Sequence, residues 1–218
     1  METTDFAKYL SNFLTKYLAG ERNCSSNTIL AYKDTFVQFI VFMKEQKGID
    51  VKRLTLENIT KEVVLEFLDF IQDSRQCSNA TRNCRLAALK SFFSYIQYEN
   101  PERMYQWQRI MAVKVKRHQK QHITYLTTDG IKLLFEQPDL DTHRGRRNLA
   151  LLSLLYDSGA RVQEIIDLTP SSVRLDNPSS LKITGKGGKA RIVPLQEEQT
   201  VLLTYIAATH HQCIDLLD

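Results

Sequence analysis

Apolar residues recur every three or four positions through the first hundred residues, a spacing that predicts amphipathic helices rather than strands. The four predicted stripes are Phe6, Tyr9, Phe13 and Tyr17; Ile29, Tyr32, Phe36, Phe39, Ile40 and Met43; Val64, Leu65, Leu68 and Ile71; and Leu86, Leu89, Phe93 and Ile96. Short connections between four such helices favour a small helical bundle, in which the aromatic residues form the core.

Local signals give approximate limits for these helices. Gly20 and Gly48 are expected to end the first and second helices, because glycine readily follows a helix C-terminus. The second helix is expected to begin near Ser26 or Asn27, the third after Thr60 and the fourth near Ser78, since Ser, Thr and Asn are good N-caps.

The second half of the chain has a mixed pattern. A helix is expected after a cap at Thr127 or Thr128, a strongly apolar helix from 148 to 157 closed by Gly159, a short helix ended by Thr169 and Pro170, and a last helix over roughly 197–208. Between the last two, Leu181 and Ile183 alternate with polar residues, and the sequence R-I-V-P-L returns after G-K-G-G-K. This pattern predicts a β-hairpin with a glycine-rich, doubly basic tip.

The distribution of charge along the chain is more informative than the net charge. The chain has 218 residues, enough for two domains, and a net charge of only +4. From Arg103 to His122 there are six Lys or Arg, two His and no Asp or Glu, which suits a polyanion or a solvated linker. We therefore predict domains at 1–100 and 123–218, joined by a basic linker at 101–122 that holds a short helix near 105–111.

Targeting and metal signals are missing from this sequence. Its four cysteines, Cys24, Cys77, Cys84 and Cys213, include no C-x-x-C pair, so we expect reduced thiols and no metal site. The N-terminus has no basic stretch followed by an apolar run, and no apolar run is long enough to cross a membrane. These features predict a cytoplasmic protein with no membrane partner.

Three short segments could carry chemistry. The sequence G-K-G-G-K lacks the spacing and the Ser or Thr of a nucleotide-binding P-loop, which leaves a mobile basic turn. The H-x-x-R of His143 and Arg146 fits a charged helix entrance better than a phosphate site. In G-A-R-V-Q-E, Glu164 lies three residues after Arg161 and can brace its guanidinium, which would make a phosphate clamp or a structural ion pair.

Taken together and in this order, these segments resemble the tyrosine recombinase (phage integrase) family. G-A-R-V-Q-E-I-I-D-L followed by I-T-G-K-G-G-K-A-R-I-V-P-L is similar to the first half of its catalytic domain, and A-T-R-N-C-R-L-A-A-L-K-S-F-F-S-Y-I is similar to its core-binding domain. Xer-like and transposon-borne bacterial integrases resemble the chain most. The implied fold is mainly α, a four-helix SAM-like core-binding domain followed by a partial, mixed α+β catalytic domain with a β-hairpin.

The resemblance implies DNA recombination and integration by a site-specific enzyme of mobile elements. A tyrosine attacks a DNA phosphate, arginines neutralise the charge on the phosphate oxygens, and a hairpin lysine protonates the departing 5′-oxygen. Arg161 matches the first catalytic arginine, Glu164 the acidic residue that supports it, and Lys186 the hairpin lysine, 186 − 161 = 25 residues later. No cofactor or metal is implied.

The sequence departs from the family pattern after Lys186. It has no later H-x-x-R, no following His or Trp, and no tyrosine except Tyr205, which lies in an apolar stretch where the family has a packing aromatic. We therefore expect a partial catalytic domain that binds double-stranded DNA without cleaving it, and that assembles with other protomers only at full length. Phosphate contacts are expected from Arg82, Arg85, Lys114, Lys116, Arg117, Lys120 and Lys189.

Two alternatives remain open on the sequence alone. The chain could be a truncated DNA-binding regulator of a full-length recombinase, which would occupy its sites without cleaving them. It could also be a helical interaction protein without a nucleic-acid role, which would show no DNA affinity even at low salt.

Overall fold

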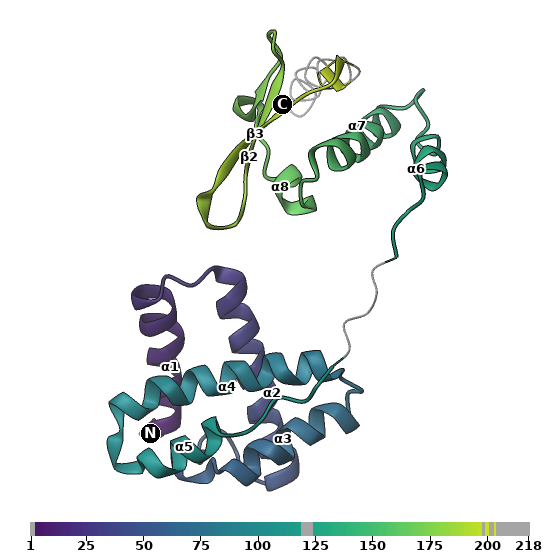
Figure 1. Ribbon diagram of the computed structural model, residues 1–218. Coiled ribbons are helices and arrows are strands. Elements are labelled where there is room, and N and C mark those ends of the chain that lie inside the picture. Colours follow the sequence, from purple (N-terminus) through teal and green to yellow (C-terminus); the bar gives the residue numbers. More distant parts are fainter. Residues whose placement is uncertain (1–2, 119–123, 198, 201–202, 204–218) are drawn as a thin grey trace, which may run out of the picture. The chain divides into compact units, whose positions relative to one another are not determined.

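The computed structural model describes residues 3–118, 124–197, 199, 200 and 203. The chain divides into two compact units, Met1–Gln121 and His122–Asp218, which are described separately below. The first unit is helical and the second combines helices with a small antiparallel sheet (Figure 1). This is the fold class that the sequence predicts.

The helical unit contains the four predicted helices and a fifth. Their bounds are α1 Asp5–Asn12, continued by the π-helical turn η1 Phe13–Glu21, α2 Ser26–Lys47, the 3-10 turn η2 Leu56–Asn58, α3 Lys61–Asp73, α4 Asn79–Glu99, the 3-10 turn η3 Pro101–Arg103 and α5 Met104–Met111. The starts of α2, α3 and α4 are confirmed, with Ser25, Thr60 and Ser78 as the capping side chains. Gly20 does not end its helix as expected, because the π-helical turn continues to Glu21.

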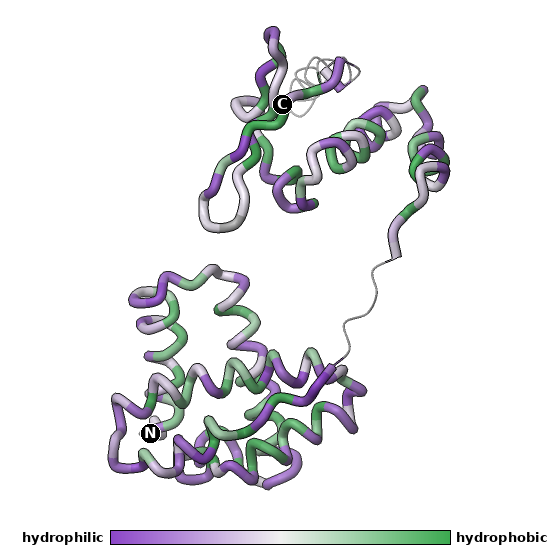
Figure 2. The backbone as a smooth tube through the Cα atoms, viewed as in Figure 1, coloured by the Kyte–Doolittle hydropathy of each residue, from purple (hydrophilic) through white to green (hydrophobic). Residues whose placement is uncertain are grey.

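Aromatic side chains form the core of this unit, as their spacing predicts. Phe13 and Phe92 are fully buried, and their ring centroids lie 5.3 Å apart in an edge-to-face arrangement. Phe36 approaches Phe92 to 5.0 Å from a second helix. Edge-to-face pairs of this kind add to the free energy gained from burying apolar surface. Figure 2 shows hydrophobic and hydrophilic residues alternating along the helices of this unit.

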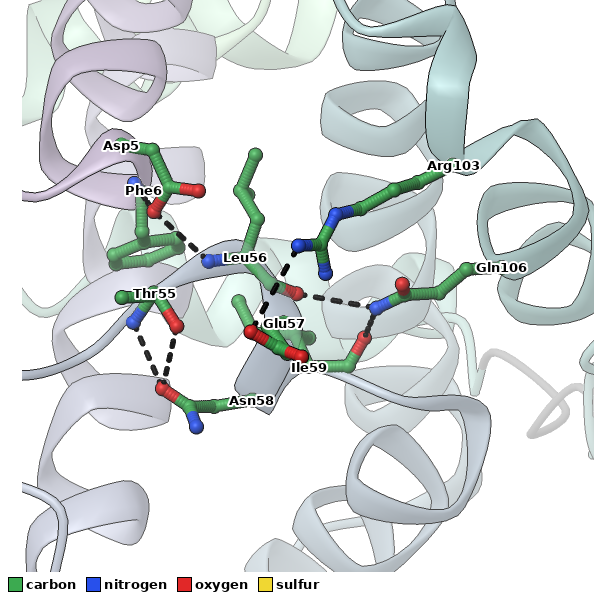
Figure 3. Close-up of polar contacts among 9 residues, drawn as sticks. All are labelled: Asp5, Phe6, Thr55, Leu56, Glu57, Asn58, Ile59, Arg103 and Gln106. Carbon is green, nitrogen blue, oxygen red and sulfur yellow. Dashed lines mark hydrogen bonds and ion pairs between the residues drawn. The ribbon is translucent and has the colours of Figure 1, made fainter.

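The short helix expected near 105–111 is present as α5, and it packs on the helical bundle, which the sequence did not predict. Trp107, Ile110 and Val113 are buried in the same core as the first four helices. The Gln106 side-chain amide donates to the carbonyl oxygens of Leu56 and Ile59, at 3.1 and 2.8 Å, which ties α5 to the turn η2 (Figure 3). Apolar positions at 107, 110 and 113 put one face of this short segment against the bundle. Packing therefore continues past Asn100 to Val113.

The turn η2 is itself held by polar contacts from distant segments. The Asp5 carboxylate, at the start of α1, accepts a 3.0 Å hydrogen bond from the Leu56 backbone N–H (Figure 3). The Asn58 side-chain oxygen accepts from the Thr55 backbone N–H at 2.9 Å, which closes the turn. The loop before α3 thus bonds to residues from both ends of the helical unit.

The second unit contains the predicted hairpin and three helices before it. Its elements are α6 Thr128–Phe135, α7 His143–Ser158, α8 Val162–Ile166, the 3-10 turn η4 Pro170–Ser172, β1 Val173–Arg174, β2 Ser180–Thr184, the 3-10 turn η5 Lys186–Gly188 and β3 Ala190–Pro194. The sheet order is β1-β2-β3, all antiparallel, and β2 and β3 pair with Leu181 opposite Val193. The helix expected over 197–208 falls almost wholly outside the described residues.

Helix α7 is longer than its apolar run indicates. It begins at His143 rather than at Asn148, because the Thr142 hydroxyl caps it by accepting a 3.0 Å bond from the Gly145 N–H. Gly145 is required there, since a Cβ at this position would lie 1.7 Å from the Asp139 carbonyl oxygen. The preceding loop therefore packs directly on the first turn of α7.

A small apolar core places the hairpin against α7 and α8. Leu154 of α7, Ile165 of α8, and Leu181 and Ile183 of β2 are buried together. Because side chains alternate along a strand, the burial of Leu181 and Ile183 puts that face of β2 against the helices. The helix α8 and the basic hairpin are thereby fixed side by side, which positions the site described next.

Candidate functional site

Arg161 lies at the junction between α7 and α8. Helix α7 ends at Gly159, whose left-handed φ of +57° turns the chain, and Arg161 is the N-cap residue of α8. Its backbone N–H donates to Glu164 Oε2 at 3.1 Å, and its guanidinium Nη1 donates to Oε1 at 2.7 Å. The Arg161 side chain is 76% exposed while that of Glu164 is only 6% exposed. The carboxylate thus holds one edge of a guanidinium that otherwise faces solvent.

Arg191 of β3 provides a second guanidinium for the same carboxylate. Its Nη2 donates to Glu164 Oε2 at 2.9 Å, from a position 27 residues further along the chain. Arg191 was not among the predicted site residues, although its alternation with Ile192 marks it as a residue on one face of a strand. Gly185 lies against the same group, because a Cβ there would be 3.0 Å from Glu164 Oε1. Glu164 therefore joins α8 to β3 and lies against Gly185, which follows β2.

These contacts keep Glu164 ionised. The side-chain bond from Arg191 contributes most, followed by the backbone and side-chain bonds from Arg161, and together they lower the pKa of the Glu164 carboxyl to about 2. Burial of the carboxyl opposes this shift. At neutral pH the group is a fixed negative charge between two arginines.

The hairpin tip has backbone angles that glycine adopts readily. Gly187 and Gly188 have left-handed φ values of +79° and +74°, which side chains with a Cβ rarely adopt. The Gly185 N–H donates to the Lys189 carbonyl oxygen at 2.8 Å, which closes the turn. Lys189 is exposed, whereas the side chain of Lys186 lies outside the described part of the structure.

Chemically, this arrangement suits an oxyanion. A planar guanidinium held along one edge can donate from its remaining N–H groups to two oxygens of one phosphate. Arg161 has this freedom, because only Nη1 is bonded to Glu164 among the described residues. The exposed Lys189 backbone and side chain follow on the neighbouring turn.

Of the two arginines of α4 expected to contact phosphates, one is buried and the other is partly exposed and paired within the helical unit. Arg82 is 3% exposed, and its Nε and Nη1 have no hydrogen-bond partner among the described residues. Arg85 forms an ion pair with Asp34 and donates to the Thr35 hydroxyl at 3.1 Å. Arg82 therefore presents almost no surface to a phosphate, while Arg85 is 18% exposed and already paired with Asp34; both assignments stay predictions.

The basic segment after α5 is exposed but not free. Lys114, Lys116 and Arg117 are all exposed, and Lys120 lies outside the described residues. The Lys116 ammonium donates to Gln72 Oε1 at 2.6 Å and lies 3.5 Å from an Asp69 carboxylate oxygen. The charge of the Lys116 ammonium is thus partly neutralised by the protein itself.

Two further findings concern the described residues alone. None of their helices is both long and apolar enough to cross a bilayer. Within the same residues, no group of three His, Cys, Asp or Glu side chains lies close enough together to hold a metal ion.

Family comparisons match both units. The profile described as "Phage integrase, N-terminal SAM-like domain" matches residues 11–100. The profile described as "Phage integrase family" matches residues 124–214. The two matches leave out the segment that contains α5 and the basic residues.

Curated relatives align with nearly the whole chain. An integrase/recombinase of Sinorhizobium fredii, y4rD, is 31% identical over 206 residues, covering 94% of this chain and 73% of its own length. A second one from the same organism, y4rC, is 33% identical, with 90% and 59% covered. The tyrosine recombinase XerC of Thermodesulfovibrio yellowstonii is 32% identical, with 95% and 64% covered. The chain therefore spans about three fifths to three quarters of the length of these relatives.

Solved structures show the same arrangement of elements. The site-specific recombinase XerH, bound to a palindromic difH substrate after cleavage, aligns with a TM-score of 0.63 and 25% identity, over 84% of this chain and 53% of that one. The Tn1549 transposon integrase in complex with transposon right end DNA aligns with a TM-score of 0.62 over 92% of this chain and 64% of that one. Its identity is 14%, so this second likeness concerns the fold alone.

Proposed function

We propose that this chain, which belongs to the tyrosine recombinase (phage integrase) family, binds double-stranded DNA and contributes part of a strand-exchange site. Family membership supports site-specific recombination as the reaction that such a site serves. The observation that carries the proposal is the exposed guanidinium of Arg161, held along one edge by the buried carboxylate of Glu164. This geometry suits a phosphate in the DNA backbone.

Each site residue has a role in the proposed reaction. A tyrosine hydroxyl releases its proton to solvent and its oxygen bonds to phosphorus, while the bond from phosphorus to the 5′-oxygen breaks and that oxygen takes up a proton. Arg161 stabilises the charge on the non-bridging oxygens, and Lys186 supplies the proton. Glu164 holds Arg161 in position. Because the phosphotyrosyl bond preserves the energy of the broken bond, no cofactor is required.

No tyrosine of this sequence matches the attacking tyrosine of the family pattern. Tyr205 is the only tyrosine after Lys186, and it lies in an apolar stretch. We therefore propose that the 218-residue chain binds DNA and forms no covalent adduct by itself. Occupation of a recombination site without cleavage would also serve a regulator of a full-length recombinase, and the XerH complex shows a related protein on DNA.

Titration of a labelled DNA duplex, followed by fluorescence anisotropy at several salt concentrations, tests the proposal. Phosphate contacts predict an affinity that falls steeply as salt rises. Arg161→Ala should weaken binding and reduce the salt dependence by about one phosphate contact. Arg174→Ala, which removes an exposed charge from β1 of the same unit, is the matched control and should have a smaller effect.

Two results would contradict the proposal. One is the absence of binding at about 50 mM salt by a chain whose circular dichroism shows the expected helices. The other is a covalent DNA adduct on a denaturing gel, which would show that the chain contains its own nucleophile.

A further inference from the structure

The basic segment that follows α5 is attached to α4 by its backbone. Asn83 of α4 accepts a 3.0 Å bond from the Lys116 N–H at Oδ1, and donates from Nδ2 to the Lys116 carbonyl oxygen at 2.8 Å. One side chain thus satisfies both backbone groups of a single residue, as a neighbouring strand would. We call residues Lys114–Arg117 the docked arm.

Asn79 repeats this contact one helical turn earlier. Its Nδ2 donates to the Arg117 carbonyl oxygen at 2.9 Å. Residues four apart in a helix lie on the same face, so Asn79 and Asn83 form a short row of amides beneath consecutive residues of the arm. Three hydrogen bonds therefore fix two successive residues of an extended segment.

A third amide sets the orientation of this row. Gln72 of α3 donates from Nε2 to Asn79 Oδ1 at 2.9 Å and accepts at Oε1 from the Lys116 ammonium at 2.6 Å. Because Asn79 Oδ1 is occupied by this donor, its Nδ2 is directed to the arm. The Lys116 side chain thus belongs to the attachment, together with the carboxylate of Asp69 at 3.5 Å.

The remaining cations of the docked arm are available to a ligand. Lys114 and Arg117 are exposed, and neither has an ion pair with any residue that the structure describes. Attachment through the backbone leaves these two side chains unused while fixing the positions from which they extend.

We propose that Asn79 and Asn83 are positioning residues, which hold Lys114 and Arg117 as a preformed pair of contacts to the phosphates of duplex DNA. This inference rests on the proposed DNA binding and extends it. Ordering a free backbone on binding reduces affinity, because conformational entropy is lost at that step. The amide row removes this cost, since the arm is ordered before DNA arrives.

The central variant is Asn79→Ala/Asn83→Ala, which keeps every charge and removes all three bonds to the arm. Freeing two backbone residues should reduce affinity for a DNA duplex by roughly thirty-fold or more at a fixed salt concentration. Gln97→Ala removes an amide from a later turn of the same helix and is the matched control. Its affinity should stay within about twofold of the unaltered chain.

A double-mutant cycle separates positioning from general damage. Lys114→Ala/Arg117→Ala should reduce the slope of log affinity against log salt by about 2, as expected for two lost phosphate contacts. If the amides act through these cations, removing the amides in this background should have no further effect on affinity. A purely structural role would instead weaken binding equally in both backgrounds.

The single tryptophan, Trp107, reports on folding in the same samples. Its emission should be unchanged in the amide variant, because α5 is held by the core and not by the arm. If the emission shifts to that of exposed tryptophan, Asn83→Ala and Asn79→Ala are measured separately, and each should give part of the affinity loss.

The outcomes distinguish the two proposals. If the unaltered, folded chain does not bind DNA, the proposed function itself is overturned. Binding by the unaltered chain, with equal affinity in the folded amide variant, would overturn the positioning role alone.

Discussion

Replacement of Trp107 by alanine tests whether the segment after α4 belongs to the helical core. The Trp107 side chain is completely buried, and its ring stacks on Phe93 with centroids 5.4 Å apart. Its indole N–H donates to the Asn100 carbonyl oxygen at 3.0 Å. The substitution removes the ring contact and the hydrogen bond together, and leaves a cavity between α4 and α5.

The expected loss is large for one substitution. Truncating a buried tryptophan costs about 3–5 kcal/mol of unfolding free energy, from lost transfer energy and the cavity that remains. A domain of this size is stable by roughly 5–15 kcal/mol, so about a fifth or more of that stability would be lost. Trp107→Phe keeps most of the ring but leaves the Asn100 carbonyl without its donor, which should cost about 1–3 kcal/mol.

Urea unfolding of the whole chain, followed by circular dichroism at 222 nm, measures these differences. The control is Tyr98→Ala, which removes a ring that is 80% exposed on α4 and should change stability by no more than about 0.5 kcal/mol. A loss below about 1 kcal/mol for Trp107→Ala would refute the reasoning, because residues 101–113 would then behave as a connecting segment.

Three further predictions concern the second unit. With its pKa at about 2 instead of the ordinary 4.5, Glu164 contributes stability that is complete above about pH 4.5 and is lost as the pH falls toward 2. Glu164→Gln should therefore flatten the decline of the urea midpoint between pH 5 and 2.5, and an unchanged decline would contradict the assignment. Gly145→Ala should destabilise this unit by roughly 3 kcal/mol, because the added Cβ would lie 1.7 Å from the Asp139 carbonyl oxygen. That oxygen belongs to the backbone, so it can move away only if the loop moves with it. Gly20→Ala, which meets nothing within 4 Å, is its control and should not destabilise the chain in a thermal melt. Gly185→Ala should displace the Glu164 carboxylate and raise its pKa, which an NMR titration of the side-chain carboxyl would detect; an unchanged pKa would mean that the carboxylate yields without losing its donors.

Local signals in the sequence placed several elements correctly, although they gave the wrong helix end at Gly20 and missed the Thr142 cap of α7. The cap residue Thr60 and the glycine at 159 act within a few positions, so the helix limits they indicate are confirmed. The Arg161–Glu164 contact also spans only three residues and was predicted. Arg82 could have been placed correctly by the same logic, because it lies four residues before Leu86 on the buried stripe of α4.

Features that depend on distant partners were not predictable in this way. Strand β1 is only two residues long and exists because β2 pairs with it. Arg191 meets Glu164 across 27 residues, and Asn83 meets Lys116 across 33. Periodicity describes one element at a time, so it contains no information about which polar side chains of two elements will meet.

The shared carboxylate of Glu164 has a consequence for how this region can change in evolution. An uncharged residue in its place would leave the guanidinium groups of Arg161 and Arg191 facing each other without the anion that separates them. Replacing either arginine alone would likewise unbalance a buried charge. Positions 161, 164 and 191 should therefore vary together among homologues, as a single heritable unit.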